Sequence, residues 1–210
     1  MYKRQTVILH KNDIPADIDF GSSVAIDTET MGLRPIRDPL CLVQLSSGDG
    51  NAHIVQLDRT TYDAPNLKAL MSDTAVTKIF HYARFDIAIM KAYLNVDTTP
   101  VYCTRTASRL VRTYTDRHGL RDVCRELIGV ELNKQMQSSD WGAAELTQQQ
   151  LDYAANDVLY LHQIVEKLDI MLQRENRTQL AQDCFAFLPL RAELDLAGWE
   201  DQDIFAHSSS

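Results

Sequence analysis

Residues 24–30, Val-Ala-Ile-Asp-Thr-Glu-Thr, place the carboxylates of Asp27 and Glu29 at the end of an apolar run. Apolar residues before the acids are typical of a buried strand, in which side chains alternate between the two faces. Asp27 and Glu29 therefore project from the same face. A buried carboxylate is costly unless it is paired or binds a metal, and this stretch contains no Lys or Arg. The pattern favours a cation site, although Asp-x-Glu is also typical of a solvated strand exit or a helix cap.

Residues 79–86, Ile-Phe-His-Tyr-Ala-Arg-Phe-Asp, supply a third carboxylate. They predict a short strand that turns into a helix over Phe85–Leu94, with Asp86 in its first turn. An acid at a helix N-terminus is also favoured by the helix dipole alone. The sequence of this segment by itself leaves both interpretations of Asp86 open.

Residues 153–157, Tyr-Ala-Ala-Asn-Asp, lie in a helical pattern that extends over Thr147–Asn176. A spacing of four places Tyr153 and Asp157 on one helix face. Taken alone, the pair is also compatible with a half-buried aromatic ring beside a surface acid. The succession of all three segments along one chain favours a joint site over the separate interpretations.

Length and composition indicate one globular domain. The chain has 210 residues, of which 45% are hydrophobic and 24% charged. No apolar run reaches 18 residues, which excludes a transmembrane helix, and the apolar run after Lys3 and Arg4 is too short for a signal peptide. The four cysteines show no C-x-x-C spacing, so reduced thiols in a cytoplasmic protein are expected.

The net charge of −8 is unusual for a protein that binds long nucleic acid. Such binding typically depends on about 6–10 phosphate contacts from Lys and Arg. One stretch is basic: between residues 105 and 125 there are six arginines and two acids. The balance argues against long, backbone-dominated binding without excluding a local basic channel.

Strands followed by alternating helices and strands are predicted along the chain. Strands are expected over Thr6–His10, Ser23–Thr28, Leu40–Ser46, Ala52–Leu57, Thr77–Phe80 and Val101–Cys103. Further helices are expected over Ala64–Ser72, Thr104–Arg112 and Leu120–Ile128. Ser47–Asn51 contains a strong hairpin signal. The fold class is therefore α/β, a mixed sheet with helices on both faces, and its site is expected at the carboxyl ends of strands.

The last residues differ from the rest in charge. Residues 188–210 carry five acids against Arg191 alone, with Trp199 and Phe205 among them. We expect a catalytic domain over residues 1–187 and a C-terminal tail over 188–210 that packs on a neighbouring subunit. A solvated surface segment is the alternative.

Carboxylates gathered within a few ångströms repel one another by several kcal/mol per close pair, even at an effective dielectric of about 20. Hard oxygen ligands select Mg²⁺ or Mn²⁺ to relieve that repulsion. The sequence thus predicts two divalent ions held by Asp27, Glu29, Asp86 and Asp157, with Asp27 bridging, in a site for phosphoryl displacement. Tyr153 is predicted to orient the attacking water, because an unperturbed pKa of about 10 makes it a poor base.

The motifs Asp27-x-Glu29, Asp86 and Tyr153-x-x-x-Asp157 resemble those of the DEDD exonucleases, in the branch with tyrosine in the third motif. That branch includes ribonuclease D and proofreading exonucleases. The resemblance implies a ribonuclease H-like fold, with the four acids at metal-ligand positions and the tyrosine at the water-orienting one. A more specific similarity to small, dinucleotide-cleaving bacterial members of the ribonuclease D-like group is carried by residues 41–50, 113–120, 137–141 and 203–207.

Further residues are candidates for contacting substrate. Leu33 resembles a leucine that wedges between two bases, a core leucine being the alternative. His81 is expected near the metals, although a histidine at a strand end more often has a structural hydrogen-bonding role. Candidates for binding a terminal 5′ phosphate, each of which could instead be solvated surface, are Arg112, Arg117, His118, Lys134, Gln137, Ser138 and Ser139.

The function implied is a metal-dependent 3′–5′ exoribonuclease that hydrolyses very short RNA, especially dinucleotides, to 5′-mononucleotides. The family further implies a homo-oligomer, as an octameric ring. A broader ribonuclease D-like exonuclease acting on longer or structured RNA or DNA is the alternative. An inactive scaffold that binds metal or nucleotide is a third interpretation, against which the intact set of acids argues.

Overall fold

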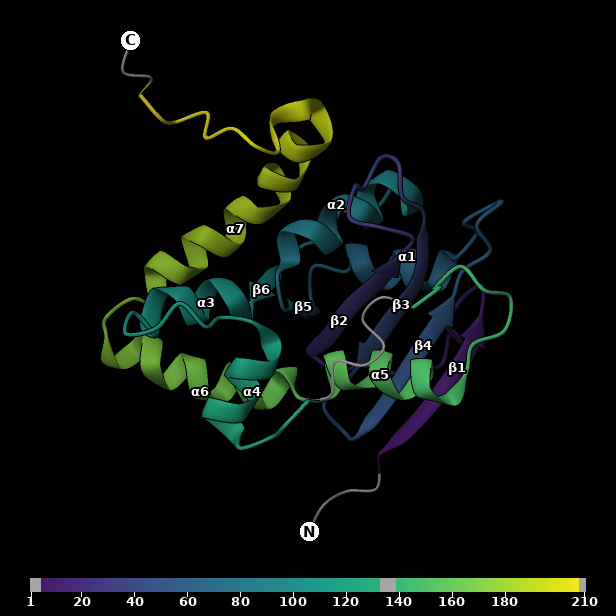
Figure 1. The fold of residues 1–210 in the computed structure, drawn as a ribbon, viewed down its shortest axis with the longest axis horizontal. Coiled ribbons are helices and arrows are strands. Elements are labelled where there is room, and N and C mark those ends of the chain that lie inside the picture. The colour runs from purple at the N-terminus through teal and green to yellow at the C-terminus, as the bar shows by residue number, and fades with distance from the viewer. Residues whose placement is uncertain (1–4, 133–138, 208–210) are drawn as a thin grey trace.

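The computed structural model describes residues 5–132 and 139–207, and a six-stranded mixed sheet lies at its centre (Figure 1). The strand order is β1-β4-β3-β2-β5-β6. The strands are β1 (Thr6–Lys11), β2 (Ser23–Thr30), β3 (Leu40–Ser46), β4 (Asn51–Gln56), β5 (Thr77–Phe80) and β6 (Val101–Cys103). Strand β3 is antiparallel to β2 and β4, and the other pairs are parallel. The predicted fold class is confirmed.

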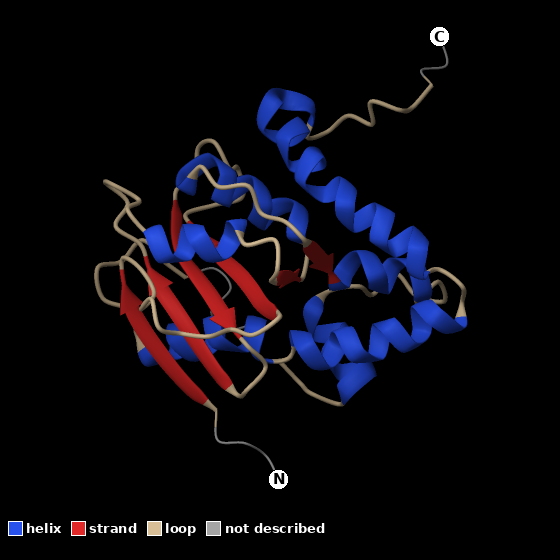
Figure 2. Ribbon diagram, turned by 180° about the vertical axis from the view of Figure 1, so that it is seen from behind, coloured by secondary structure: helices blue, strands red, loops and turns tan. Residues whose placement is uncertain are grey.

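Helices cover both faces of the sheet (Figures 1 and 2). Helix α5 (Gln148–Leu159) packs across β1 to β4 on one face, and α1 (Pro65–Ser72) and α2 (Ala83–Leu94) lie on the other. A helical layer beyond the β5–β6 edge contains α3 (Thr104–Val111), α4 (Leu120–Ile128), α6 (Leu161–Arg174) and α7 (Thr178–Leu194).

The alternation along β2 divides the sheet into an apolar face and a face that carries charge. Val24 and Ile26 are fully buried in the main core, whereas Asp27 and Glu29 are only partly buried on the face covered by α5. Strand β3 is buried throughout because it lies in the middle of the sheet. The hairpin predicted after it is confirmed, and Gly48 supplies the positive φ of +78° that its turn requires.

The prediction of one helix over Thr147–Asn176 is wrong, because the chain bends at Tyr160 between α5 and α6. No Pro or Gly marks the bend. Helix α5 packs on the sheet, whereas α6 packs on α3, α4 and α7. The bend therefore arises from two different packing partners, which helical periodicity does not report.

Helix α7 lies beyond the predicted elements, and it runs through the expected boundary between residues 187 and 188. Its C-terminal end is attached to α2 by an ion pair between Arg84 and Asp195 at 2.5 Å, and Arg191 also contacts Asp195 at 2.7 Å. The π-helical turn η1 (Asp195–Trp199) packs back on α7. In the tail beyond it, the Phe205 ring lies 6.1 Å from the Phe187 ring of α7, and Phe205 is 75% exposed. The subunit-interface role of the tail stays a prediction.

All four cysteines are free thiols, and those at positions 41, 103 and 124 are buried. Within residues 5–132 and 139–207, none of the helices combines the length and the apolar character needed to span a bilayer.

Candidate active site

Parallel pairing of β2 with β5 brings the ends of these strands to the same edge of the sheet. Asp27 and Glu29 lie in the last half of β2, and Asp86 lies in the first turn of α2, directly after β5. Tyr82 turns the chain from β5 into α2 with a φ of +85°, a strained conformation for a residue other than glycine. The Asp86 side chain is buried and accepts a hydrogen bond from Thr28 Oγ1 at 2.7 Å.

Helix α5 brings the third motif to this edge. Its start is fixed by a capping box, in which the Thr147 side chain accepts from the Gln150 backbone N–H and the Gln150 side chain accepts from Thr147. One carboxylate oxygen each from Asp27, Glu29 and Asp157 lies within 4.8 Å of the others. Asp86 is outside that group of three but lies close enough to raise the pKa of Asp27.

All four carboxyl groups have raised pKa values, and burial is the largest cause for each. The pKa of Glu29 rises to about 9, with Asp157 and Asp86 adding repulsion. The pKa values of Asp86 and Asp157 rise to about 7. Among the described residues, no Lys or Arg forms an ion pair with any of the four carboxylates. Converging carboxylates of this kind are the ligand set that a hard divalent cation requires. The residues present therefore fit Mg²⁺ or Mn²⁺.

Metal-free protein is expected to lose thermal stability as the pH rises. The four carboxyl groups hold protons more tightly in the folded than in the unfolded chain. The folded state therefore binds more protons than the unfolded state between roughly pH 4 and about pH 9. The lower limit is where an ordinary carboxyl group titrates, and the upper limit is the raised pKa of Glu29. The free energy of unfolding then falls as pH rises through this window. Scanning calorimetry in chelator between about pH 5 and 9 measures the effect, and millimolar Mg²⁺ should restore the melting temperature at about pH 8.

Asp157→Asn is the matched variant for this measurement, because it removes one charge from the cluster and keeps the side-chain shape. It should flatten the pH dependence in chelator and reduce the gain from Mg²⁺. Identical pH profiles for the two proteins would show that the carboxylates do not interact as the structure indicates.

Tyr153 lies beside the carboxylates, with its ring centroid 6.0 Å from that of Trp141. Burial raises the pKa of Tyr153, and the charges of Asp157, Glu29 and Asp27 raise it further. The phenol is thus protonated at neutral pH. In the metal-free protein it can donate or accept a hydrogen bond but is a poor base, which supports the predicted orienting role.

A cavity of about 690 Å³ opens above the cluster, lined by Asp27, Glu29, Tyr153 and Asp157 among others. Leu33 lies at this cavity with its side chain 84% exposed, so the alternative of a core leucine is wrong. The preceding Gly32 permits the close approach of Asp38, whose carboxylate would lie 2.2 Å from an added Cβ. This packing fixes the loop that presents Leu33.

His81 and Ser139 also line the cavity. The His81 Nδ1 atom is 2.8 Å from Thr104 Oγ1, and burial lowers the His81 pKa to about 3, so the ring is neutral. Lys134, Gln137 and Ser138 lie outside the described residues.

The structure does not bring Arg112 to the cavity. Its side chain is fully buried, and its guanidinium donates to Ser108 Oγ at 2.9 Å and to the Arg117 carbonyl at 2.7 Å, with Glu126 as its ion-pair partner. Arg117 and His118 do not line the cavity either. Arg112 therefore holds together the segment between α3 and α4, and the prediction that it binds substrate phosphate finds no support in this geometry.

Sequence reasoning missed two cations that do line the cavity, Arg105 and Arg121. The Arg105 guanidinium lies 5.0 Å from the centre of the Tyr82 ring. Arg121 lies in the first turn of α4, where no described side chain caps the free backbone N–H groups. The arginine-rich stretch over residues 105–125 was the available signal, but the sequence does not show which of its six arginines line the cavity.

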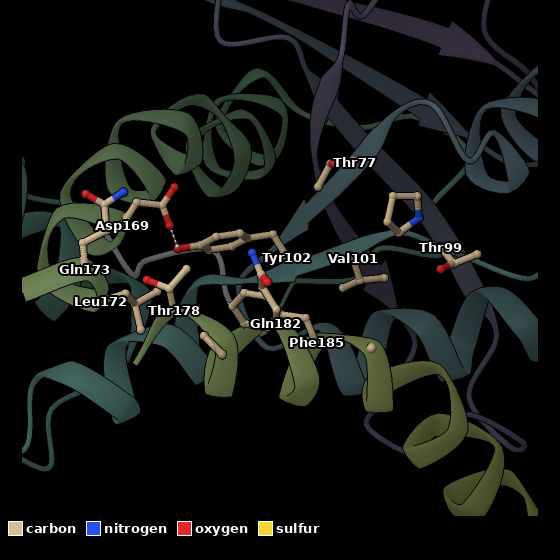
Figure 3. Close-up of a pocket in the computed structure, with 13 residues that line it drawn as sticks. Thr77, Thr99, Val101, Tyr102, Asp169, Leu172, Gln173, Thr178, Gln182 and Phe185 are labelled. Atoms are coloured by element: carbon tan, nitrogen blue, oxygen red, sulfur yellow. Dashed lines mark hydrogen bonds between the residues drawn. The ribbon is translucent and has the colours of Figure 1, made fainter. Parts of the chain in front are cut away.

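A second cavity, of about 570 Å³, lies between β6, α6 and α7 (Figure 3). Tyr102 donates to Asp169 Oδ1 there at 2.8 Å, and most other lining atoms are apolar. Among the described residues that line it there is no Lys or Arg. This cavity lacks the chemistry needed to bind a phosphate or a cluster of metal ions.

Known proteins match the chain over most of its length. A family model described as 3′–5′ exonuclease matches residues 11–173. The chain is 34% identical over 154 residues to a ribonuclease D of Acidiphilium cryptum, and the aligned residues cover 73% of this chain and 39% of that protein. The chain thus spans about two fifths of the length of the ribonuclease D relatives that it matches.

Among solved structures, NrnC of Brucella melitensis, a nanoRNase C, superimposes with a TM-score of 0.94 at 53% identity, covering 97% of this chain and 99% of that one. NrnC bound to pGG gives a TM-score of 0.94 at 51% identity, with 98% and 100% covered. NrnC with bound Mg²⁺ gives 0.93 at 51% identity, with 97% and 100% covered. These matches confirm the predicted resemblance to ribonuclease D-like enzymes and to nanoRNase C, and with it the ribonuclease H-like fold.

Proposed function

Because the chain belongs to the 3′–5′ exonuclease family, we propose that it is a metal-dependent 3′–5′ exoribonuclease that acts on very short RNA, with dinucleotides preferred. The observation that carries this proposal is the convergence of Asp27, Glu29 and Asp157 within 4.8 Å at a cavity also lined by Tyr153. Acids from one strand and one helix far apart in sequence meet there, in a setting that disfavours their charge unless cations bind.

Asp27, Glu29, Asp86 and Asp157 would hold two divalent ions, with Asp27 as the shared ligand. When bound, such ions acidify a coordinated water and stabilise charge on the leaving oxygen. The protein's own residues position the reactants: the Tyr153 phenol orients the water for in-line attack on phosphorus, and Leu33 packs against the bases. The water oxygen bonds to phosphorus, the bond from phosphorus to the 3′ oxygen breaks, and the leaving oxygen takes a proton. The products are a 5′-mononucleotide and a chain with a free 3′ hydroxyl.

The preference for dinucleotides is supported by cations at the same cavity as the acidic cluster. Arg105, Arg121 and the backbone N–H groups at the start of α4 provide positive charge among the lining residues. These groups suit a single terminal 5′ phosphate. The relative NrnC has been solved bound to pGG, and the net charge of −8 disfavours a long phosphate track.

A chain-length series tests the proposed preference. Turnover of 5′-phosphorylated RNAs of two, three, five and seven nucleotides should be highest for the dinucleotide and should be abolished by chelator. Arg121→Gln should reduce kcat/KM for the phosphorylated dinucleotide about tenfold or more, since a charge-assisted hydrogen bond contributes roughly 1.5–3 kcal/mol. It should have little effect on a dinucleotide that lacks the 5′ phosphate.

Equal kcat/KM values across the series would favour the broader ribonuclease D-like activity on longer RNA. Absence of hydrolysis for every length, with Mg²⁺ or Mn²⁺ present, would instead favour a scaffold without activity.

We also propose that the tail after Trp199 contacts a neighbouring subunit in a homo-oligomer. Ile204 is 45% exposed and Phe205 is 75% exposed, so the tail presents apolar area to solvent in a single chain. Removing residues 200–210 leaves α7 and the Arg84–Asp195 ion pair in place. The truncated protein should have a smaller mass in solution by light scattering, and an unchanged mass would refute the contact.

A further inference from the structure

Gln44 lies in the centre of the sheet, directly opposite the central carboxylate of the site. It is paired with Asp27 on β2 and with Ile54 on β4. Directly opposite residues of an antiparallel pair project from the same face, with Cβ atoms ~4.5–5.5 Å apart. The Gln44 amide therefore shares with Asp27 the face that α5 covers.

The Gln44 side chain is fully buried, and neither Nε2 nor Oε1 has a hydrogen-bond partner among the described residues. A buried amide without a partner reduces the free energy of unfolding, so such a group calls for an explanation. The apolar neighbours of Gln44 do not provide this explanation. On its other neighbouring strand, β4, Gln44 is paired with Ile54, which belongs to an apolar cluster with Leu42, Trp141 and Ala154.

Among the polar groups near Gln44, Trp141 Nε1 is also buried without a partner among the described residues, but an indole N–H only donates and cannot accept from Gln44 Nε2. Ser46, two residues further along β3, donates its hydroxyl to the Asn51 carbonyl at 2.7 Å. Leu42, two residues in the other direction, is apolar and lies opposite Glu29. Asp27 is the remaining polar neighbour by strand register, and a glutamine side chain is long enough to reach across the pair.

We propose that Gln44 is a positioning residue, whose amide N–H donates to a carboxylate oxygen of Asp27 when the cluster holds its ions. The inference rests on the proposed function, because it assigns a role toward the same metal site. A donor behind a ligating carboxylate fixes the orientation of that carboxylate, and loss of such a donor typically reduces metal affinity or activity about 10–100-fold. Gln44 does not touch the substrate, since it does not line the cavity.

Gln44→Met tests the role, because methionine keeps the length of the side chain and removes both polar atoms. In chelator, the melting temperature of this variant should equal or exceed that of the wild type, since an unpartnered buried amide has been removed. The Mn²⁺ concentration that gives half of the melting-temperature rise should increase about tenfold or more. Calorimetric titration with Mn²⁺ should show the same loss of affinity without any substrate present.

Leu42→Met is the matched control, because Leu42 lies on the same strand and face but opposite Glu29. It should leave the half-saturating Mn²⁺ concentration unchanged. Gln44→Asn is a second test variant: it keeps the amide but draws it back from Asp27, and it should also weaken Mn²⁺ binding.

Equal Mn²⁺ affinities for the wild type and both Gln44 variants would overturn the inference and leave the proposed function standing. A wild-type protein that neither responds to Mn²⁺ nor hydrolyses a dinucleotide would overturn the proposed function, and this inference with it. Weakened Mn²⁺ binding in the Gln44 variants, with Leu42→Met unaffected, is the result that supports a positioning role over a packing role.

Discussion

Asp27→Asn is expected to lower kcat for a 5′-phosphorylated dinucleotide by at least about a thousandfold, because the charge stabilisation that bound ions supply amounts to several kcal/mol. Among the four acids, Asp27 is the one whose pKa is raised by all three others. It also lies within 4.8 Å of both Glu29 and Asp157. Asparagine keeps the size of the side chain but loses the charge, so the fold should remain intact.

Steady-state hydrolysis with saturating Mn²⁺ measures the effect. Asp122→Asn is the matched control, because Asp122 lines the same cavity but forms an ion pair with Arg125 at 2.7 Å. Its kcat should stay within about fivefold of the wild type, as expected for a partly exposed ion pair. If Asp27→Asn retained a tenth or more of the wild-type rate, Asp27 would not be a metal ligand.

Tyr153→Phe is expected to lower kcat about 10²–10³-fold while leaving mononucleotide binding nearly unchanged. The expected size follows from typical contributions of positioned proton-bearing groups. In the metal-free protein the raised pKa of Tyr153 keeps the phenol protonated, which favours the proposed role of orienting the water over that of removing its proton. The phenylalanine ring preserves the packing against Trp141, whose centroid is 6.0 Å away.

The measurement is a separation of kcat from KM, together with a calorimetric Kd for a 5′-mononucleotide. Tyr160→Phe is the control, since the Tyr160 hydroxyl accepts a hydrogen bond from Gln5 and the residue does not line the cavity. A loss of nucleotide binding equal to the loss of kcat would assign Tyr153 to substrate binding in place of water orientation.

The positions of the central acids and of Tyr153 were predictable because they follow from side-chain periodicity within single strands and helices. The alternation of side chains along β2 places Asp27 and Glu29 on one face of the strand. Helical spacing places Tyr153 and Asp157 on one face of α5. Mixed α/β sheets place their sites at the carboxyl ends of strands, so the position of Asp86 directly after β5 could be anticipated as well. These inferences needed only periodicity and the preference of acids for cations.

The parts that were missed depend on contacts between distant elements. Tyr160 bends the chain because α5 and α6 pack on different partners. Arg112 and Arg121 look alike in the sequence, yet one is buried beside Glu126 and the other lines the cavity. Which arginine faces a substrate is decided by the packing of α3, α4 and α6, which helical spacing does not report. The role inferred for Gln44 could not be predicted from the sequence either, because an amide within an apolar strand gives no sequence pattern of its own.

Two features of the cavity act together in the proposed selection of short RNA. The exposed side chain of Leu33 and the cations Arg105 and Arg121 lie around the same opening as the acidic cluster. A substrate held by a terminal phosphate and by packing of its bases needs no further phosphate contacts. The acidic balance of the whole chain is compatible with such a substrate and disfavours long RNA.

The claim on which the account depends is that the gathered carboxylates bind divalent ions, and a Mn²⁺ titration of metal-free protein tests it most directly. Electron paramagnetic resonance of free Mn²⁺ at about pH 8 should show uptake by the wild type, accompanied by a rise in melting temperature. Asp27→Asn and Asp157→Asn should each reduce both responses. A wild-type protein that takes up no Mn²⁺ at millimolar concentration, and melts at the same temperature with and without it, would contradict the account.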